Sequence, residues 1–388
     1  MATALYRREV DIFSQFDLGR EVSLLKACLA QEDQFEVAFG EFDSDENLDA
    51  LTWGEIRLIP FLFRKLEHSG ISTPRFSIYK GIYTKFWYVH KMEREPTALL
   101  LFSALGEFDL LFLKGAALQK LVYIGDPVTR PVDDIDILVR PKDRILVIEK
   151  LLQEGFEPDQ VWPREITMNL KMSIGLSNQS HHVDVHWGLY PSAGKSHPVE
   201  QLYERRIRTT TGIHDLPTLS ISDHLLHNLI HGHAKNQVSP IRWVLDCALL
   251  ATHPKNDWSL LTATATDWGW QRAAKAQLNV LRSGYQVDIP NHVFGGLETG
   301  NSSVPLGWYQ VNRGLRPSVR RGLMSMLVAN PLNLREISGN RSRPYLAHLF
   351  QALAIWWKAW EGPISRWNRF WVLVGSTRQK ASPSTFRN

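Results

Sequence analysis

The stretch RPVDDIDILV, residues 130–139, places three aspartates within four positions, and an apolar run follows directly. The run predicts a buried strand, in which successive side chains point to opposite faces. Asp134 and Asp136 then share one face, while Ile135 between them turns toward the core. Two carboxylates about 7 Å apart on one face repel each other unless a cation lies between them. We therefore interpret Asp134 and Asp136 as ligands of Mg²⁺ or Mn²⁺, which carboxylate oxygens bind well.

A third carboxylate lies in HHVDVHW, residues 181–187, where apolar and polar residues alternate. The alternation puts the two valines and the tryptophan on the core face and Asp184 with His186 on the other. If this strand lies beside 134–139, the carboxylates of Asp184 and Asp136 come within about 4–6 Å of each other. Three acidic side chains can hold two metal ions and support an in-line displacement at phosphorus. In the alternative interpretation the aspartates form a solvated strand edge, and Asp184 lies on an outer face.

Basic and small residues precede the aspartates. In LKGAALQ, Lys114, Gly115 and Ala116 fall at a predicted strand-to-helix turn, where backbone N–H groups at a helix N-terminus can bind phosphate. Lys114 adds a point charge, and Arg130 in the following loop can contact phosphate through two nitrogens. The alternative is that Gly115 serves backbone geometry alone.

The order LLFLKGAAL, RPVDDIDILV and HHVDVHW resembles the DNA polymerase β-like nucleotidyltransferase superfamily. More narrowly, it resembles an uncharacterised bacterial nucleotidyltransferase family, over about residues 50–250 and including RWVLD at 242–246. The superfamily motifs carry over to Gly115, Ala116 and the three aspartates at 134, 136 and 184. Ala116 stands where the superfamily often has Gly or Ser, so a hydroxyl contact with phosphate is lost.

The resemblance implies transfer of a nucleoside monophosphate from an NTP, such as ATP, to a hydroxyl or phosphate of an acceptor, with release of pyrophosphate. It implies that the metal is held by Asp134, Asp136 and Asp184, the last of which accepts the acceptor's proton. The resemblance implies that Gly115 and Ala116 bind nucleotide, and the residue types and positions add Lys114, Arg130 and His186 to the expected nucleotide-binding set. Asn at Asp134 or Asp136 is expected to abolish transfer without destabilising the fold.

Two questions of function stay open from the sequence. The acceptor is a small molecule, a sugar phosphate, a peptide or a protein. The alternative from another functional class is a scaffold: a protein of the same fold that binds nucleotide or a partner without catalysing transfer.

The elements that position these residues follow from hydrophobic periodicity and from Gly and Pro positions. Residues 1–105 are predicted to be helical, 106–219 to form the nucleotidyltransferase core, 220–375 to be helical and 376–388 to be a disordered tail. The fold class is α+β, a small mixed sheet with flanking helices between helical N- and C-terminal regions. Individual expectations are a helix at 51–70, a strand at 109–113, a helix at 115–125, a strand at 134–139, a helix at 142–155, and a hairpin of 167–176 with 181–187.

Three histidines, His224, His227 and His231, lie at steps of three and four and share one helix face. They are open to three interpretations: structural zinc ligands, residues lining the nucleotide or acceptor cleft, or packed side chains. Asp246 is expected to pair with Arg242, one helical turn before it.

Composition narrows the class of partner. The chain has 388 residues, a net charge of +4 and two cysteines, which favour a soluble cytoplasmic protein and do not support nucleic-acid binding.

The aromatic stretch IWWKAWEGPISRWNRFWVLV, residues 355–374, is interpreted as a helical hairpin that closes the core. The alternatives are a peripheral membrane or protein contact and stacking of bases.

Overall fold

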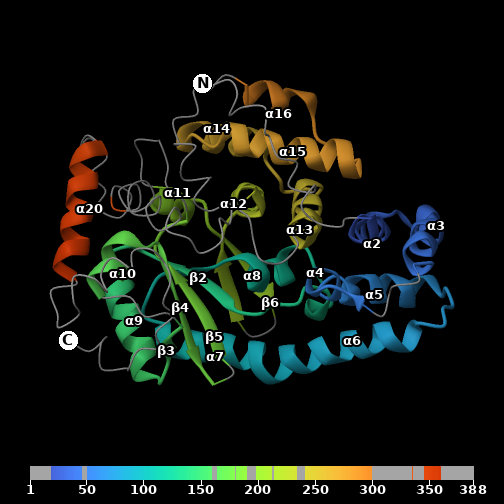
Figure 1. Ribbon diagram of the computed structural model, residues 1–388, viewed down its shortest axis with the longest axis horizontal. Helices are drawn as coiled ribbons and strands as arrows, with labels where there is room; N and C mark the ends of the chain where they lie inside the picture. Colours follow the sequence, from blue (N-terminus) through green and yellow to red (C-terminus); the bar gives the residue numbers. More distant parts are fainter. Residues whose placement is uncertain are drawn as a thin grey trace.

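The protein folds around one seven-stranded mixed sheet with helices on both faces, as the computed structural model shows in Figure 1. The structure describes residues 19–45, 50–159, 164–179, 181–189, 198–211, 214–233, 241–298, 334 and 345–359. The predicted α+β class is confirmed.

The sheet has the strand order β3-β4-β5-β2-β1-β7-β6. The pairs β2–β5 and β1–β7 are parallel, and the other neighbours are antiparallel. The strands are β1 (Leu110–Phe112), β2 (Ile135–Val139), β3 (Glu157–Pro158), β4 (Ser173–Asn178), β5 (His181–His186), β6 (Ile207–Thr211) and β7 (His214–Thr218).

Helices precede, cover and follow the sheet. The N-terminal group is α2 (Gly19–Leu29), α3 (Glu32–Asp43), α4 (Trp53–Ile56), α5 (Ile59–Ser69), α6 (Phe76–Val89), the π-helix η3 (His90–Arg94) and α7 (Glu95–Leu105). Between strands lie α8 (Lys114–Leu121), the 3₁₀ turn η4 (Pro127–Thr129), α9 (Arg144–Gln153), α10 (Arg164–Leu170) and α11 (Pro198–Glu204). After the sheet follow α12 (Ile221–His233), α13 (Ile241–Ala251), α14 (Trp258–Trp268), α15 (Gln271–Tyr285), α16 (Asn291–Gly296) and α20 (Tyr345–Ala359).

The two faces of β2 pack into two different hydrophobic clusters. Ile135 and Ile137 belong to the cluster formed with α7 and α9, whereas Leu138 belongs to the cluster that contains α12. Since alternate residues of a strand share a face, Asp136 lies on the Leu138 side. The polar face of β2 is therefore directed toward α12.

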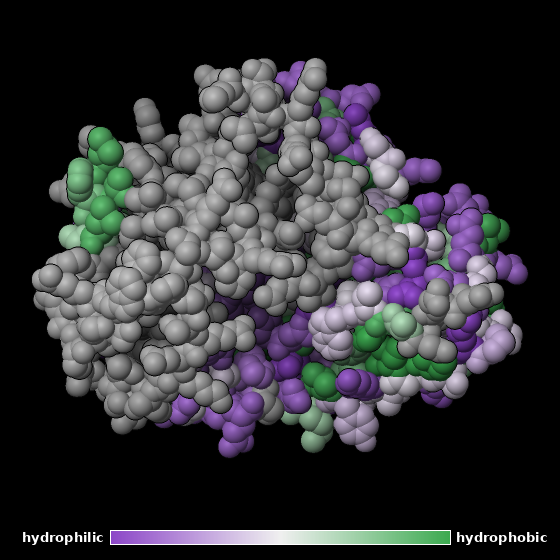
Figure 2. Space-filling model, viewed as in Figure 1, coloured by the Kyte–Doolittle hydropathy of each residue, from purple (hydrophilic) through white to green (hydrophobic). Residues whose placement is uncertain are grey.

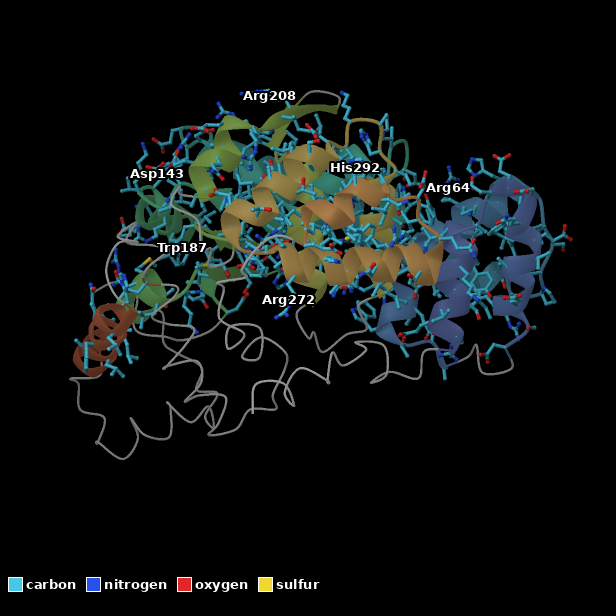
Figure 3. All side chains as sticks on the ribbon, turned by 90° about the horizontal axis from the view of Figure 1, so that it is seen from above. Arg64, Asp143, Trp187, Arg208, Arg272 and His292 are labelled. Atoms are coloured by element: carbon cyan, nitrogen blue, oxygen red, sulfur yellow. The ribbon has the colours of Figure 1, made fainter. Side chains whose placement is uncertain are left out.

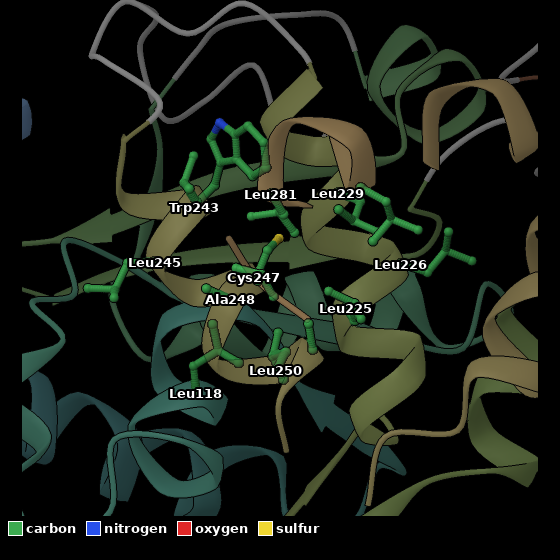
Figure 4. Packing of buried hydrophobic residues seen from close by; sticks show 14 of the residues in the cluster. Leu118, Leu225, Leu226, Leu229, Trp243, Leu245, Cys247, Ala248, Leu250 and Leu281 are labelled. Atoms are coloured by element: carbon green, nitrogen blue, oxygen red, sulfur yellow. The ribbon is translucent and has the colours of Figure 1, made fainter. Parts of the chain in front are cut away.

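The larger cluster joins helices from both ends of the described chain. Figure 4 shows Cys247 and Ala248 of α13 among leucines of α12 and α15, including Leu229 and Leu281. Leucines and phenylalanines of α2, α3 and α5 belong to the same cluster. The N-terminal helices and the helices after β7 consequently share one core.

A glycine allows the closest approach in this core. A Cβ atom on Gly232 of α12 would lie 2.2 Å from the indole of Trp243 on α13. Any side chain at position 232 would therefore collide with a ring that is itself buried.

Most predicted elements are present, with three differences. The helix expected at 51–70 is divided into α4 and α5, because Pro60, in the first turn of α5, has no N–H to continue the hydrogen bonds of α4. The first half of the strand expected at 167–176 belongs to helix α10, and β4 begins only at Ser173. The strands β6 and β7 were not predicted, because IRTTT and HDLPT are short and polar, and HDLPT contains a proline.

The hairpin of β4 and β5 is confirmed, and so is the adjacency of β2 and β5. The adjacency is the feature on which the three-carboxylate hypothesis depends, because it brings residues 48 positions apart into one register, Asp136 opposite Asp184.

The aromatic stretch 355–374 lies for the most part outside the described residues, as does the tail 376–388. The described helix α20 contacts α10, and Figure 2 shows an apolar surface there, with Leu346 and Phe350 exposed. Across the described ranges, every helix is too short or too polar to cross a bilayer.

Candidate functional site

The parallel pairing of β2 with β5 builds the site. Asp136 of β2 is the register partner of Asp184 of β5, and His186 follows on the same face. One ligand atom from each of these three side chains lies within 4.8 Å of the others. The separation expected for carboxylates that share a metal is therefore present.

Asp136 is the buried centre of the cluster. Lys114 Nζ donates a hydrogen bond of 2.5 Å to Asp136 Oδ1, and His186 Nε2 lies 3.0 Å from the same oxygen. Burial alone would raise the pKa of Asp136, but the charges and hydrogen bonds of Lys114 and His186 lower it well below its usual range. Asp136 is consequently an ionised carboxylate.

His186 bridges the two carboxylates, since its Nε2 also lies 3.0 Å from Asp184 Oδ2. Burial alone would lower its pKa, but the Asp184 charge and hydrogen bonds to both aspartates raise it to about 9. The imidazole is therefore protonated near neutral pH. To bind a metal it must first lose this proton, because only neutral imidazole is a ligand.

Asp134 has a different environment. Its side chain is exposed at the edge of the site, and among the described residues no cationic group lies within ion-pair distance of it. Its pKa is raised, first by lost hydration and then by the charge of Asp136. Asp134 thus lacks an ion-pair partner among the described residues, and the more distant charges of Lys114 and Arg242 offset its negative charge only in part.

Lys114 reaches Asp136 through an uncommon backbone conformation. Its φ is 43°, in the left-handed region that few non-glycine residues adopt, at the point where β1 gives way to α8. Such a conformation is retained where the surrounding structure determines it, often at functional sites. Here it accompanies the contact of the ammonium group with the aspartate.

Gly115 is required by packing. A Cβ at this position would lie 2.8 Å from Val132 Cγ2 and 3.4 Å from Arg130 Nη1. Gly115 itself does not have a positive φ, so the close approach of Val132, and not an unusual backbone conformation, requires the glycine. This packing is compatible with phosphate binding, because the first N–H groups of α8, which include those of Gly115 and Ala116, have no intrahelical partner.

Arg130 does not lie where a phosphate ligand was expected. Its side chain is buried, and Nε and Nη2 donate hydrogen bonds of 2.7 and 2.8 Å to the carboxylate of Asp246. Tyr123 also donates to Asp246, at 2.7 Å. The expectations that Arg130 contacts phosphate and that Asp246 pairs with Arg242 are both corrected, because the fold pairs Arg130 with Asp246 across 116 residues.

His224, His227 and His231 of α12 are buried or half-buried, and their imidazoles are neutral. Burial lowers the pKa of His224 and of His231 to about 3 and that of His227 well below its usual value. Thr218 donates its hydroxyl proton to the Phe112 carbonyl, so His224 Nε2 must donate to Thr218 Oγ1, 2.7 Å away.

No zinc site emerges at these histidines in the part of the chain that the structure describes. The charges of Lys114, Asp136 and His186 do influence the pKa of His231. The histidine face of α12 is therefore directed toward the carboxylate cluster, but none of the three histidines lines the cavity described below.

A polar cavity of about 690 Å³ opens beside the carboxylates. Its lining residues come from the loop before β2, η3, α10 and the β4–β5 hairpin: Arg94, Asp133, Asp134, Asp159, Thr167, Lys171, Ser173, Ile174, Gly175, His182, Val183 and Asp184. Asp134 and Asp184 thus face both the cluster and a space large enough for a small substrate.

Asp159 is a carboxylate that sequence reasoning missed. It lies over Gly175, whose Cβ would be only 2.5 Å from Asp159 Oδ2, and Gly175 is the register partner of Asp184. A glycine within a strand often marks such a close approach, which is the one signal in the sequence that could have indicated it.

Residues 97–283 match the model of a family described as uncharacterised nucleotidyltransferase. The matched segment contains β1, β2 and β5, and with them Lys114 and all three aspartates. The match supports a nucleotidyltransferase family and a transferase activity for this part of the chain. A search of curated proteins finds no match.

Proposed function

We propose that the protein is a metal-dependent nucleotidyltransferase that moves a nucleoside monophosphate from an NTP to a hydroxyl or phosphate of an acceptor. One observation carries the proposal: Asp136, Asp184 and His186 converge on adjacent parallel strands beside Lys114, within the segment that matches a nucleotidyltransferase family.

The donor atoms fit a divalent cation. Three atoms within 4.8 Å of one another can each reach an ion placed among them, at about 2.1 Å for Mg²⁺. Carboxylate oxygens suit Mg²⁺ and Mn²⁺, and the imidazole suits Mn²⁺ better. Asp134 would add an oxygen from the rim. When bound, the cation would neutralise phosphate charge during the displacement.

The chain's own groups have distinct roles in the proposed reaction. The first N–H groups of α8 and the Lys114 ammonium hold phosphate oxygens. An acceptor oxygen then forms a bond to the α-phosphorus, and the bond from this phosphorus to the bridging oxygen of the β-phosphate breaks, which releases pyrophosphate. Asp184, which lines the polar cavity, takes the acceptor's proton.

The acceptor and the compartment belong to the proposal. The cavity carries both acidic and basic side chains, which suits a polar small molecule or sugar phosphate better than an apolar one. The two cysteines are free and buried, in line with a reducing compartment such as the cytoplasm, where NTP is available.

A nucleotide-binding scaffold without catalysis is the second candidate. Lys114 and His186 already compensate the charge of Asp136, so the cluster is stable without a metal. Such a protein would bind NTP without consuming it.

The test uses two labels. Protein is incubated with Mg²⁺ or Mn²⁺, a panel of polar acceptors, and ATP labelled at either the α- or the γ-phosphorus. Nucleotidyl transfer moves the α-label to an acceptor and releases the γ-label as pyrophosphate, whereas a kinase would move the γ-label. EDTA and the Asp136→Asn substitution should stop transfer, and Asp288→Asn at an exposed position should not.

Binding of ATP with no α-label on any acceptor and no pyrophosphate would favour the scaffold. An Asp136→Asn variant with full turnover would end the catalytic assignment.

A further inference from the structure

Arginines from three separate segments surround the loop that leads into the aspartates, residues 130–134. Arg94 Nε donates to the Val132 carbonyl at 3.0 Å, and Arg242 Nη1 donates to the Pro131 carbonyl at 3.2 Å. Arg57, which follows α4, forms an ion pair with Asp133. Arg130 lies within the loop itself.

The buried negative charge near these arginines is already engaged. Asp246 accepts two hydrogen bonds from Arg130 and one from Tyr123. Among the described residues, no carboxylate lies within ion-pair distance of Arg242. Among the described residues, the one carboxylate in ion-pair contact with Arg57 is that of Asp133, which is 42% exposed, and the buried Nε of Arg57 has no hydrogen-bond partner.

The arginines therefore repel one another. The pKa of Arg57 is lowered to about 9 by burial and then by the charges of Arg242 and Arg130. The pKa of Arg242 is also lowered to about 9, by burial and then by Arg130. A polyvalent anion placed between Arg57 and Arg242 would relieve both effects, because it supplies the missing counter-charge.

Arg57 and Arg242 lie close to the carboxylate cluster. Asp134 is an electrostatic neighbour of both arginines and is also the rim carboxylate of the site. Gly115 at the start of α8 packs against Val132 of the same loop. Asp134 is itself the last residue of this loop, so phosphates held at the aspartates would lie at the end of the segment that Arg57 and Arg242 contact.

We propose that Arg57 and Arg242 form a subsite for the terminal phosphates of the nucleotide. The inference rests on the proposed function for the identity of the ligand, a nucleoside triphosphate. It assigns a binding role to Arg57, the residue after α4, which lies before the segment 97–283 that matches the family.

The first experiment compares ligands that differ only in terminal phosphates. Calorimetry measures the affinity of ATP, AMP and inorganic tripolyphosphate for the wild type, Arg57→Gln, Arg242→Gln and the control Arg208→Gln, whose arginine is exposed on the edge strand β6 (Figure 3). We expect Arg57→Gln and Arg242→Gln to weaken ATP and tripolyphosphate binding by roughly tenfold or more and to leave AMP unchanged, because a charge-assisted hydrogen bond is lost.

The second experiment needs no variant and so does not depend on folding of the glutamine substitutions. Phenylglyoxal labels arginines of the wild-type protein, and peptide mass spectrometry follows each position. Tripolyphosphate at ten times its dissociation constant should slow labelling of Arg57 and Arg242 by about tenfold and leave Arg208 unaffected.

The outcomes separate this inference from the proposed function. Tripolyphosphate protection of Arg57 and Arg242 without any nucleotidyl transfer would support the subsite and count against catalysis. ATP turnover with unprotected arginines, and with ATP affinities of the variants equal to that of the wild type, would overturn the subsite and leave catalysis standing.

Discussion

Asp134 and Asp136 are two residues apart on one strand face, yet their surroundings differ. Asp136 is buried against Lys114 and His186, whereas Asp134 is exposed and lacks a cationic partner among the described residues. The expectation that losing either carboxylate leaves stability unchanged therefore no longer applies to Asp136. Its removal would leave the Lys114 ammonium without its ion-pair partner and leave His186 paired with Asp184 alone.

We predict that Asp136→Asn lowers the free energy of unfolding of the metal-free protein by about 3 kcal/mol or more, the usual cost of breaking a buried ion pair. Asp134→Asn should leave the melting temperature equal or higher, because the raised pKa of Asp134 shows that its charge is unfavourable in the folded state. Both variants should lose transfer. Thermal unfolding in EDTA measures the difference, and equal melting temperatures would contradict the assigned environments.

At the scale of the element, α12 joins the site to the helical core. Its histidine face lies near Lys114 and His186, and Gly232 at its C-terminal end contacts Trp243 of α13. These features lead to two measurable predictions. One concerns how the free energy of unfolding depends on pH, and the other concerns the size of the side chain tolerated at position 232.

The first prediction for α12 concerns pH. The folded pKa of His224 and His231 is about 3, below the ordinary value near 6.5, so the unfolded chain takes up protons that the folded chain does not. The contribution of these two histidines to stability is complete above about pH 6.5 and falls as the pH drops toward 3, by about 1.4 kcal/mol per histidine and pH unit. Urea unfolding between pH 7.5 and 5 measures this slope.

His224→Gln keeps a donor for Thr218 and removes one titrating group, so it should reduce the slope by about one proton. A slope identical to that of the wild type would contradict this prediction. It would mean that His224 binds the same number of protons in the folded and in the unfolded chain.

The second prediction for α12 concerns packing. Gly232→Ala should destabilise the protein by about 1–3 kcal/mol, since the new methyl group would overlap the Trp243 ring. The matched control is Gly81→Ala in α6, where no atom lies within 4 Å of the added Cβ. There the higher helix propensity of alanine should stabilise by about 1 kcal/mol. Chemical denaturation of both variants distinguishes the two, and a stabilised Gly232→Ala would show that the α12–α13 contact is loose.

At the scale of the whole molecule, the shared core decides how the chain can be divided. The segment 97–283 that matches the family contains the sheet and α12–α15, but α2, α3 and α5 lie in the same hydrophobic cluster as α12 and α13. Arg57 also reaches the site loop from the N-terminal side.

We therefore predict that residues 97–283 alone do not fold cooperatively. Without α2 and α5, the apolar side chains of α12 and α13 that pack in the same core would be exposed to water. Such a fragment should bind a hydrophobic dye and lack a sharp thermal transition. Co-expression with residues 1–96 as a separate chain should restore both properties toward those of the full protein. A cooperative transition of the isolated fragment would mean that the N-terminal helices are an independent unit.

The sequence by itself determined the local chemistry. Alternation placed Asp134 with Asp136 and Asp184 with His186, and glycines marked the ends of several helices, because side-chain direction and backbone freedom are properties of neighbouring residues. The polar strands β6 and β7 were not predicted, because a strand that is stabilised by pairing with its neighbours needs little hydrophobic alternation in its own sequence.

Only the tertiary structure decided which distant groups meet. Arg130 and Lys114 looked like equal candidates for phosphate, but Arg130 is paired with Asp246 and Lys114 reaches Asp136 from a left-handed backbone position. Asp159 came to the site because Gly175 left room for it, and Arg57 because two helical regions share one core. The physical reason is that burial and charge pairing act through space, so their outcome depends on contacts between segments that the local sequence does not contain.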